Sequence, residues 1–125
     1  TLILDLTFNQ NYFERMIHHE IFHMIDNSFP ELFKKNQWSE LNNKDFSYAS
    51  CSTCTDLLGL DLEVTKGFLT EYSMSTAEED MAEIYSLLKT NFKEIDLLIK
   101  KDNILTKKKN FLIKGLKEID EKFIF

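Results

Sequence analysis

Apolar residues recur at helical spacing over residues 12–27, which predicts one amphipathic helix there. The positions that repeat are Phe13, Met16, Ile17, Ile21, Met24 and Ile25. Asn9 or Asn11 can cap the start of this helix, and Pro30 lies just beyond its end. We therefore expect the apolar face of this helix to pack against the core.

The second half of the chain carries three more helical patterns, over residues 76–89, 91–101 and 103–123, of which the last two form the C-terminal helices 91–123. Ser75 has capping-box spacing to Glu78 at the start of the first of them. Residues 1–6 are short, apolar and partly β-branched, which predicts an edge strand. The expected fold class is therefore mainly α, with a small α+β remnant.

The middle of the chain has no regular pattern. Residues 36–56 are polar and rich in Asn and Ser, which is typical of a loop. Trp38, Phe46 and Tyr48 are expected to anchor this loop to the core. Residues 36–67 as a whole match no known motif.

Cys51 and Cys54 have the C-x-x-C spacing of half a zinc ribbon, a redox pair or a small disulfide. A zinc ribbon needs a second pair of cysteines, and the chain has only these two. A redox motif usually opens a helix after a strand, whereas residues 47–55 have the composition of a loop. We therefore expect either a disulfide between the two cysteines or two free thiols. The pair does not indicate a cellular compartment.

Length and charge narrow the class of protein. The 125 residues suit a single domain, 1–125, and because the first residue is Thr1 we expect a fragment or a processed form that lacks an N-terminal portion. The apolar runs are too short for a membrane span, and the net charge of −6 argues against nucleic-acid binding. Residues 1–88 carry five basic and fifteen acidic side chains, which favours cationic partners or metal ions. The oligomeric state is not indicated.

Residues 19–23 form an H-E-x-x-H sequence inside the first predicted helix. Residues four apart stand one above the other on a helix, so His19 and His23 can direct two imidazoles at one zinc ion. Glu20 lies about 100° from His19 and about 60° from His23 around the helix. Its carboxylate can therefore reach a zinc-bound water without binding the metal. His18 points elsewhere and is expected to be a core or supporting residue.

A zinc site of this kind needs a third protein ligand. The extended H-E-x-x-H-x-x-G-x-x-H pattern requires a glycine and a histidine where this chain has Asp26 and Phe29. Because no histidine lies outside residues 18–23, the third ligand must be a carboxylate or a cysteine. Glu79 and Glu83 share one face of the next predicted helix, where one carboxylate can bind zinc and the other can orient a zinc-bound imidazole. Without the H-E-x-x-H helix, these residues would be interpreted as a solvated acidic helix N-terminus.

The H-E-x-x-H sequence followed by an E-x-x-A-E sequence at residues 79–83 resembles the gluzincin zinc metallopeptidases. It is most similar to the group that contains the anthrax lethal factor catalytic domain and related zinc-binding metallopeptidases. The resemblance implies that Glu79 is the third ligand to Zn²⁺, beside the two histidines, and that Glu83 supports one of the imidazoles. It also implies that Tyr72, seven residues before Glu79, polarises the scissile carbonyl.

This resemblance implies a zincin-like domain that hydrolyses peptide bonds with a zinc-activated water, with Glu20 as the general base. The expected partner is a protein or peptide substrate, and a secreted effector or toxin is the setting that the resemblance suggests. The alternative is a catalytically inactive zinc-binding domain that acts as an interaction module. The resemblance spans about residues 12–88, and the sheet that normally holds an extended substrate would be reduced to residues 1–6 or lost.

Overall fold

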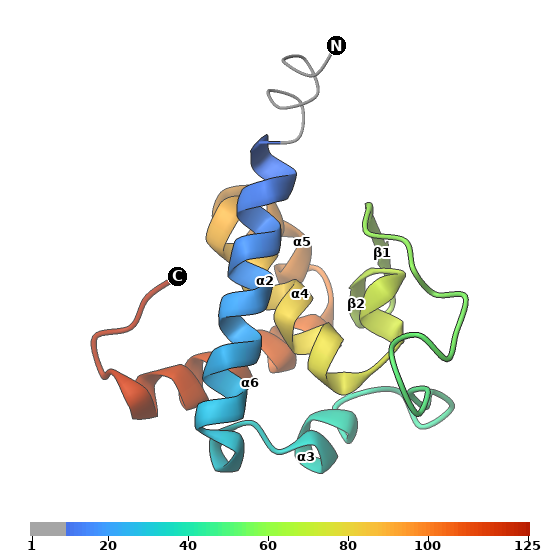
Figure 1. Cartoon of the computed structure of the whole chain (residues 1–125), viewed down its shortest axis with the longest axis horizontal. Coiled ribbons are helices and arrows are strands. Elements are labelled where there is room, and N and C mark those ends of the chain that lie inside the picture. The colour runs from blue at the N-terminus through green and yellow to red at the C-terminus, as the bar shows by residue number, and fades with distance from the viewer. Residues whose placement is uncertain (1–9) are drawn as a thin grey trace.

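A computed structural model describes residues 10–125 of the chain, and the strand expected at residues 1–6 lies outside them (Figure 1). The described residues are mainly helical with one two-stranded antiparallel sheet, which confirms the expected fold class. In chain order the elements are α2 (Gln10–Ser28), η1 (Pro30–Leu32), α3 (Lys35–Ser39), β1 (Leu62–Thr65), β2 (Phe68–Thr70), η2 (Tyr72–Met74), α4 (Ala77–Thr90), α5 (Phe92–Lys100) and α6 (Asn103–Ile119). No helix within residues 10–125 has the combined length and apolar character that a bilayer crossing needs.

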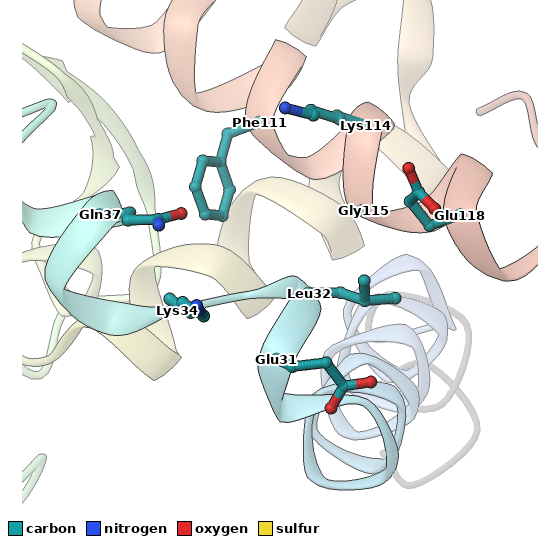
Figure 2. Close-up of a pocket in the computed structure, with 8 residues that line it drawn as sticks. All are labelled: Glu31, Leu32, Lys34, Gln37, Phe111, Lys114, Gly115 and Glu118. Atoms are coloured by element: carbon teal, nitrogen blue, oxygen red, sulfur yellow. The ribbon is translucent and has the colours of Figure 1, made fainter.

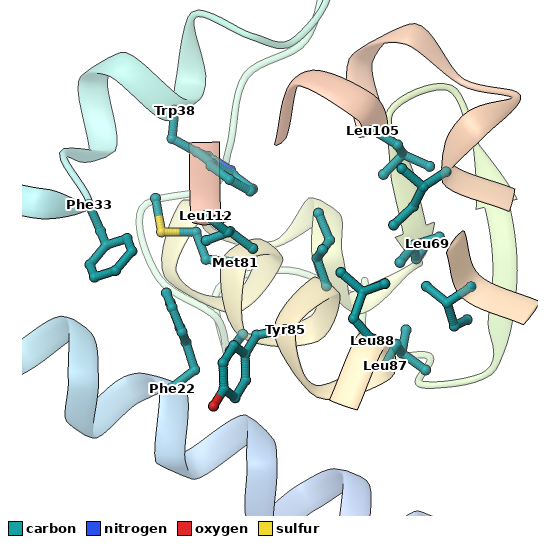
Figure 3. Close-up of a cluster of buried hydrophobic side chains, with 14 of the residues drawn as sticks. Phe22, Phe33, Trp38, Leu69, Met81, Tyr85, Leu87, Leu88, Leu105 and Leu112 are labelled. Atoms are coloured by element: carbon teal, nitrogen blue, oxygen red, sulfur yellow. The ribbon is translucent and has the colours of Figure 1, made fainter. Parts of the chain in front are cut away.

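The core is built around α4, which lies between α2 and the C-terminal helices. Every residue of α4 from Asp80 to Leu88 is buried, as expected for a helix that neighbours cover on all sides. On the α2 side, the ring of Phe22 lies 5.2 Å from that of Phe33 and 5.3 Å from that of Tyr85, measured between centroids (Figure 3). Aromatic packing therefore joins α2 and the segment after it to the central helix.

The orientation of α2 differs from the sequence-based prediction. The buried residues of this helix are His19, Phe22 and Asp26, whereas Phe13 and Met24 on the predicted core face are 66% and 68% exposed. The prediction was wrong because apolar periodicity counts only apolar residues. The buried face of α2 contains polar side chains that form hydrogen bonds and ion pairs in the interior, and these make burial tolerable.

The two-stranded sheet lies in a part of the chain where the sequence has no recognisable strand pattern. β1 and β2 pair antiparallel, and the turn between them contains Gly67 at a φ of 87°. Residues with a Cβ atom rarely adopt this backbone conformation. The residues of β2 are buried and those of β1 are exposed. Strands of three or four residues are too short to produce a clear alternation in sequence.

The last helix is shorter than predicted. α6 ends at Ile119 rather than continuing to residue 123, because Asp120 leaves the helical conformation. The side-chain Oδ1 of Asp120 accepts a hydrogen bond from the backbone N–H of Lys122 (3.0 Å), a local turn that competes with helix. Phe123 instead reaches the core from this turn.

Gly115 allows α6 to approach the segment after α2 closely. A Cβ atom at this position would lie 2.5 Å from Cε1 of Phe33 and 3.1 Å from the carbonyl oxygen of Leu32. Beside this contact, a pocket of about 270 Å³ is lined by residues of η1, α3 and α6 and by Lys34 (Figure 2). The helix contact, rather than helix geometry, therefore requires glycine here.

We predict that Gly115→Val lowers the free energy of unfolding by about 2 kcal/mol or more, because the added methyl groups overlap a fully buried ring. Asn110→Val is the matched control, since it introduces the same residue at an exposed position of α6. It should change stability by less than about 0.5 kcal/mol. Urea unfolding of both variants measures the difference, and equal midpoints would contradict the proposed overlap.

Candidate metal centre

Two imidazoles of α2 meet one helical turn apart. His19 is 3% exposed, and the side chain of His23 is 23% exposed. Their Nε2 atoms lie 3.1 Å apart, because residues four apart on a helix face the same way. The H-E-x-x-H spacing thus brings two ring nitrogens to one point between α2 and α4.

α4 brings a carboxylate to the same point. Glu79 lies in its first turn, where the backbone N–H of Glu79 donates to Oγ1 of Thr76 (3.2 Å). Thr76 therefore caps the helix, one residue after the predicted cap Ser75. Oε1 of Glu79 lies 2.5 Å from Nε2 of His23 and 3.5 Å from Nε2 of His19. The three donor atoms of this group lie within 4.8 Å of one another and can hold a metal ion.

The chemistry of these donors fits a zinc ion. Nδ1 of His19 lies 3.0 Å from a carboxylate oxygen of Glu83, which can only accept, so in the neutral ring Nε2 is an acceptor. An acceptor nitrogen, a second imidazole nitrogen and a carboxylate oxygen converge favourably only around a proton or a cation. Two ligands about 2.0–2.1 Å from zinc in a tetrahedral site lie about 3.3 Å apart. Two of the three separations between donor atoms, 3.1 Å and 3.5 Å, are close to this value, and the third, 2.5 Å between Glu79 and His23, is shorter.

The electrostatics of the group also favour a positive charge. Burial alone would lower the pKa of His19, but its hydrogen bonds with Glu79 and Glu83 outweigh burial and raise it to about 9. Burial acts to raise the pKa of Glu79, yet hydrogen bonds and charge interactions with His19 and His23 lower it to about 2. Glu79 therefore stays ionised at neutral pH, which is the state in which a carboxylate binds metal.

Glu83 holds His19 in place from the side opposite the donor group. Its Oε2 accepts from Nδ1 of His19 (3.0 Å), and its Oε1 accepts from Arg15 (2.7 Å) and from Oγ1 of Thr70 (2.9 Å). The Glu83 side chain is 1% exposed. A buried carboxylate with three donors fixes both the tautomer and the ring orientation of the imidazole.

Sequence reasoning missed Arg15, Thr70 and Ser73. Arg15 is the only arginine in the chain and lies four residues before His19, so a cation on the histidine face of the helix was a readable signal. Besides Glu83, its guanidinium donates to the carbonyl oxygen of Leu60 (2.6 Å). Thr70 and Ser73 carry no such signal, because only the fold brings the hydroxyl of Thr70 to Glu83 and the hydroxyl of Ser73 to that of Thr70 (2.9 Å).

Tyr72 lies beside the donor group at the start of η2. Its hydroxyl donates to Oε2 of Glu79. The backbone of η2 is held by both ends of one loop, since Ala49 N–H donates to Ser75 C=O and Tyr72 N–H donates to Gly59 C=O, each at 2.9 Å. The loop between Ala49 and Gly59 therefore starts and finishes on the segment that carries Tyr72.

The two cysteines lie inside this loop and are not members of the donor group. Cys51 and Cys54 form a disulfide with each other, one of the two states that the sequence left open. The group of donors that can hold a metal contains a carboxylate as its third member, and no cysteine.

Two residues of the motif region have different positions around α2. Glu20 is exposed, on the solvent side of the helix between the two histidines in sequence. His18, which the sequence places outside the ligand set, lies beside Tyr85 with 6.4 Å between ring centroids. The structure thus brings together His19, His23, Glu79, Glu83 and Tyr72, and leaves Glu20 at the adjoining surface.

Comparison with known proteins gives one family. Residues 4–125 match a family model that is described as "Putative zinc-binding metallo-peptidase". None of the curated proteins and none of the solved structures matches the chain. The matched range includes the two histidines and the glutamate of the donor group. Since the match extends over nearly the whole sequence, the chain belongs to the family of putative zinc-binding metallo-peptidases.

Proposed function

We propose that the chain is a gluzincin-type zinc peptidase in which Glu20 is the general base and Tyr72 assists at the scissile carbonyl. The observation that carries this proposal is the convergence of His19, His23 and Glu79 from two helices. Three protein ligands are typical of catalytic zinc, whereas structural zinc usually has four. Family membership implies that the substrate is a protein or a peptide.

The division of roles between two carboxylates supports the gluzincin type. Glu79 faces the Nε2 atoms of both histidines, while Glu83 accepts a hydrogen bond from Nδ1 of His19. A ligand on one side of an imidazole and a hydrogen-bonded carboxylate on the other are what this proposal requires. The same E-x-x-A-E spacing underlies the similarity to the catalytic domain of anthrax lethal factor.

Glu20 is the group that moves the proton. Zn²⁺, when bound, acidifies a water molecule and polarises a carbonyl oxygen. Glu20 follows His19 directly and is exposed, so both water and a peptide can reach its carboxylate. The carboxylate takes a proton from the attacking water and delivers it to the leaving amine nitrogen as the C–N bond breaks.

Tyr72 stabilises charge on the substrate. Its hydroxyl donates to Oε2 of Glu79, which places this donor at the edge of the metal-donor group. During hydrolysis negative charge develops on the carbonyl oxygen, and the hydroxyl of Tyr72 exchanges its acceptor on Glu79 for that oxygen. The backbone hydrogen bonds between the loop and the segment around η2 keep the backbone of Tyr72 in place.

We predict that Glu79→Ala sharply reduces zinc binding, because it removes a carboxylate that faces both histidines. Glu78→Ala is the matched control, since Glu78 is an exposed neighbour in the same first turn of α4, where its negative charge also interacts favourably with the helix dipole. Elemental analysis after gel filtration measures the metal content of each. Unchanged stoichiometry in Glu79→Ala would remove Glu79 from the ligand set.

For Glu20→Gln we expect normal zinc content and a fall in kcat of at least about a hundredfold, because the amide cannot accept the proton. Hydrolysis of a fluorogenic peptide library measures turnover. Glu14→Gln, at an exposed position of the same helix, should keep full activity. A Glu20→Gln variant that remains active would refute the role of general base.

For Tyr72→Phe we expect kcat to fall by about a hundredfold while KM changes little, since the lost hydrogen bond forms to the oxyanion and not to bound substrate. Tyr12→Phe removes a hydroxyl from an exposed ring of α2 and is the control. Steady-state kinetics on one cleaved peptide separate the two constants. An increase in KM alone would assign Tyr72 to substrate binding instead.

A further inference from the structure

A buried ion pair lies next to the turn that carries Glu79. Nζ of Lys108 in α6 is 2.7 Å from Oδ2 of Asp80 in α4, and both side chains are 0% exposed. Asp80 is the residue that follows Glu79 in the first turn of α4. Burying two charges is costly, and apolar replacements of such pairs often leave stability unchanged. The Asp80–Lys108 pair is therefore better explained by the segments that it holds in position than by a gain in stability.

Lys108 also holds the β1–β2 hairpin. Its Nζ donates to the carbonyl oxygen of Gly67 in the turn (2.7 Å) and lies 3.9 Å from the centre of the Phe68 ring. The N–H of Gly67 donates to Asp102 at the start of α6 (2.8 Å). α6 begins near the hairpin and then passes α4 (Figure 1). Both backbone polar groups of Gly67 are thus bound by side chains of α6 and its N-cap residue, and β2, which follows, carries Thr70, a donor to Glu83.

Asp80 in turn binds α3 and the irregular segment after it. Its Oδ2 accepts from the hydroxyl of Tyr48 (2.5 Å) and from Nε1 of Trp38 (3.1 Å) in addition to the ammonium of Lys108. Asn42 donates to the same Tyr48 hydroxyl (2.9 Å). Trp38 of α3, Tyr48 of the segment after it and Lys108 of α6 therefore meet at one oxygen atom in the first turn of α4.

We infer that Lys108 is a positioning residue of the metal centre. One ammonium group connects both supports of the donor group: through Asp80 it fixes the turn of Glu79, and through Gly67 it fixes the strand of Thr70. Thr70 acts on His19 by way of Glu83. This inference rests on the ligand set proposed above.

The test measures the zinc dissociation constant of the full chain by competition with a chromogenic chelator. Lys108→Met removes the ammonium and keeps a long side chain, and we expect zinc Kd to rise about ten- to a hundredfold, as when a group that supports metal ligands is lost. Lys109→Met is the matched control, because Lys109 pairs with Asp96 of α5 and contacts neither support. Its zinc Kd should equal that of the wild type.

A double variant separates positioning from stability. Asp80→Asn combined with Lys108→Met leaves no unpaired buried charge, so its Tm should lie closer to the wild-type value than that of Lys108→Met. Positioning requires that its zinc Kd stay at least about tenfold weaker than that of the wild type. A folded double variant with the wild-type Kd would overturn the inference.

If neither variant folds, hydrogen exchange on the wild-type chain tests whether the metal centre and the β1–β2 turn are coupled. Coupling between two sites is reciprocal, so zinc binding should slow exchange of the Gly67 amide more than that of the Lys101 amide at the end of α5. Equal effects on both amides would overturn the inference.

The failure of this inference can be told apart from failure of the proposed function. A chain that binds zinc and loses affinity in Lys108→Met, yet cleaves no peptide, supports the positioning role and contradicts only the peptidase. Zinc binding that is absent from the wild-type chain contradicts both. Peptide hydrolysis with an unchanged Kd in the folded double variant contradicts the positioning role alone.

Discussion

The carboxylate of Glu83 accepts hydrogen bonds from side chains of α2 and β2. These bonds hold the carboxylate in place, and the carboxylate in turn orients the imidazole of His19. Arg15 and His19 reach it from one helix, and Thr70 reaches it from the sheet. A carboxylate that is almost fully buried requires such donors, because a charge without partners in the interior is strongly destabilising. Polar geometry as well as apolar packing therefore specifies how α2 lies against α4, and Glu79 is one helical turn away from that contact.

Which donor side chains share a face within each helix could be predicted, because this depends on helical spacing alone. His19 and His23 are four residues apart, as are Glu79 and Glu83, so each pair shares a face whatever the rest of the fold does. The roles of the two carboxylates came from a resemblance and remain proposals. Thr70 could not have been found in this way, because its contact with Glu83 depends on a hairpin that the sequence did not reveal.

Much of the fold beyond the long helices was less accessible to sequence analysis. The apolar stripe of α2 indicated the wrong core face, since the buried face combines Phe22 with His19 and Asp26. The polar groups of His19 and Asp26 are satisfied by contacts outside the helix, among them the ion pair of Asp26 with Lys35 (2.7 Å). Such pairings are tertiary, and a pattern that scores single residues for hydropathy does not contain them.

The loop between Ala49 and Gly59 has a consequence for protein engineering. Both ends of this loop are hydrogen bonded to Tyr72 or Ser75, and the Cys51–Cys54 bridge closes a short ring within it. Residues added between the bridge and Gly59 would therefore leave the anchored ends together. Lengthening a loop with fixed ends costs little free energy per residue. This loop is therefore a suitable insertion point for an affinity tag or a fluorescent reporter, with its ends bonded to the segment that carries Tyr72.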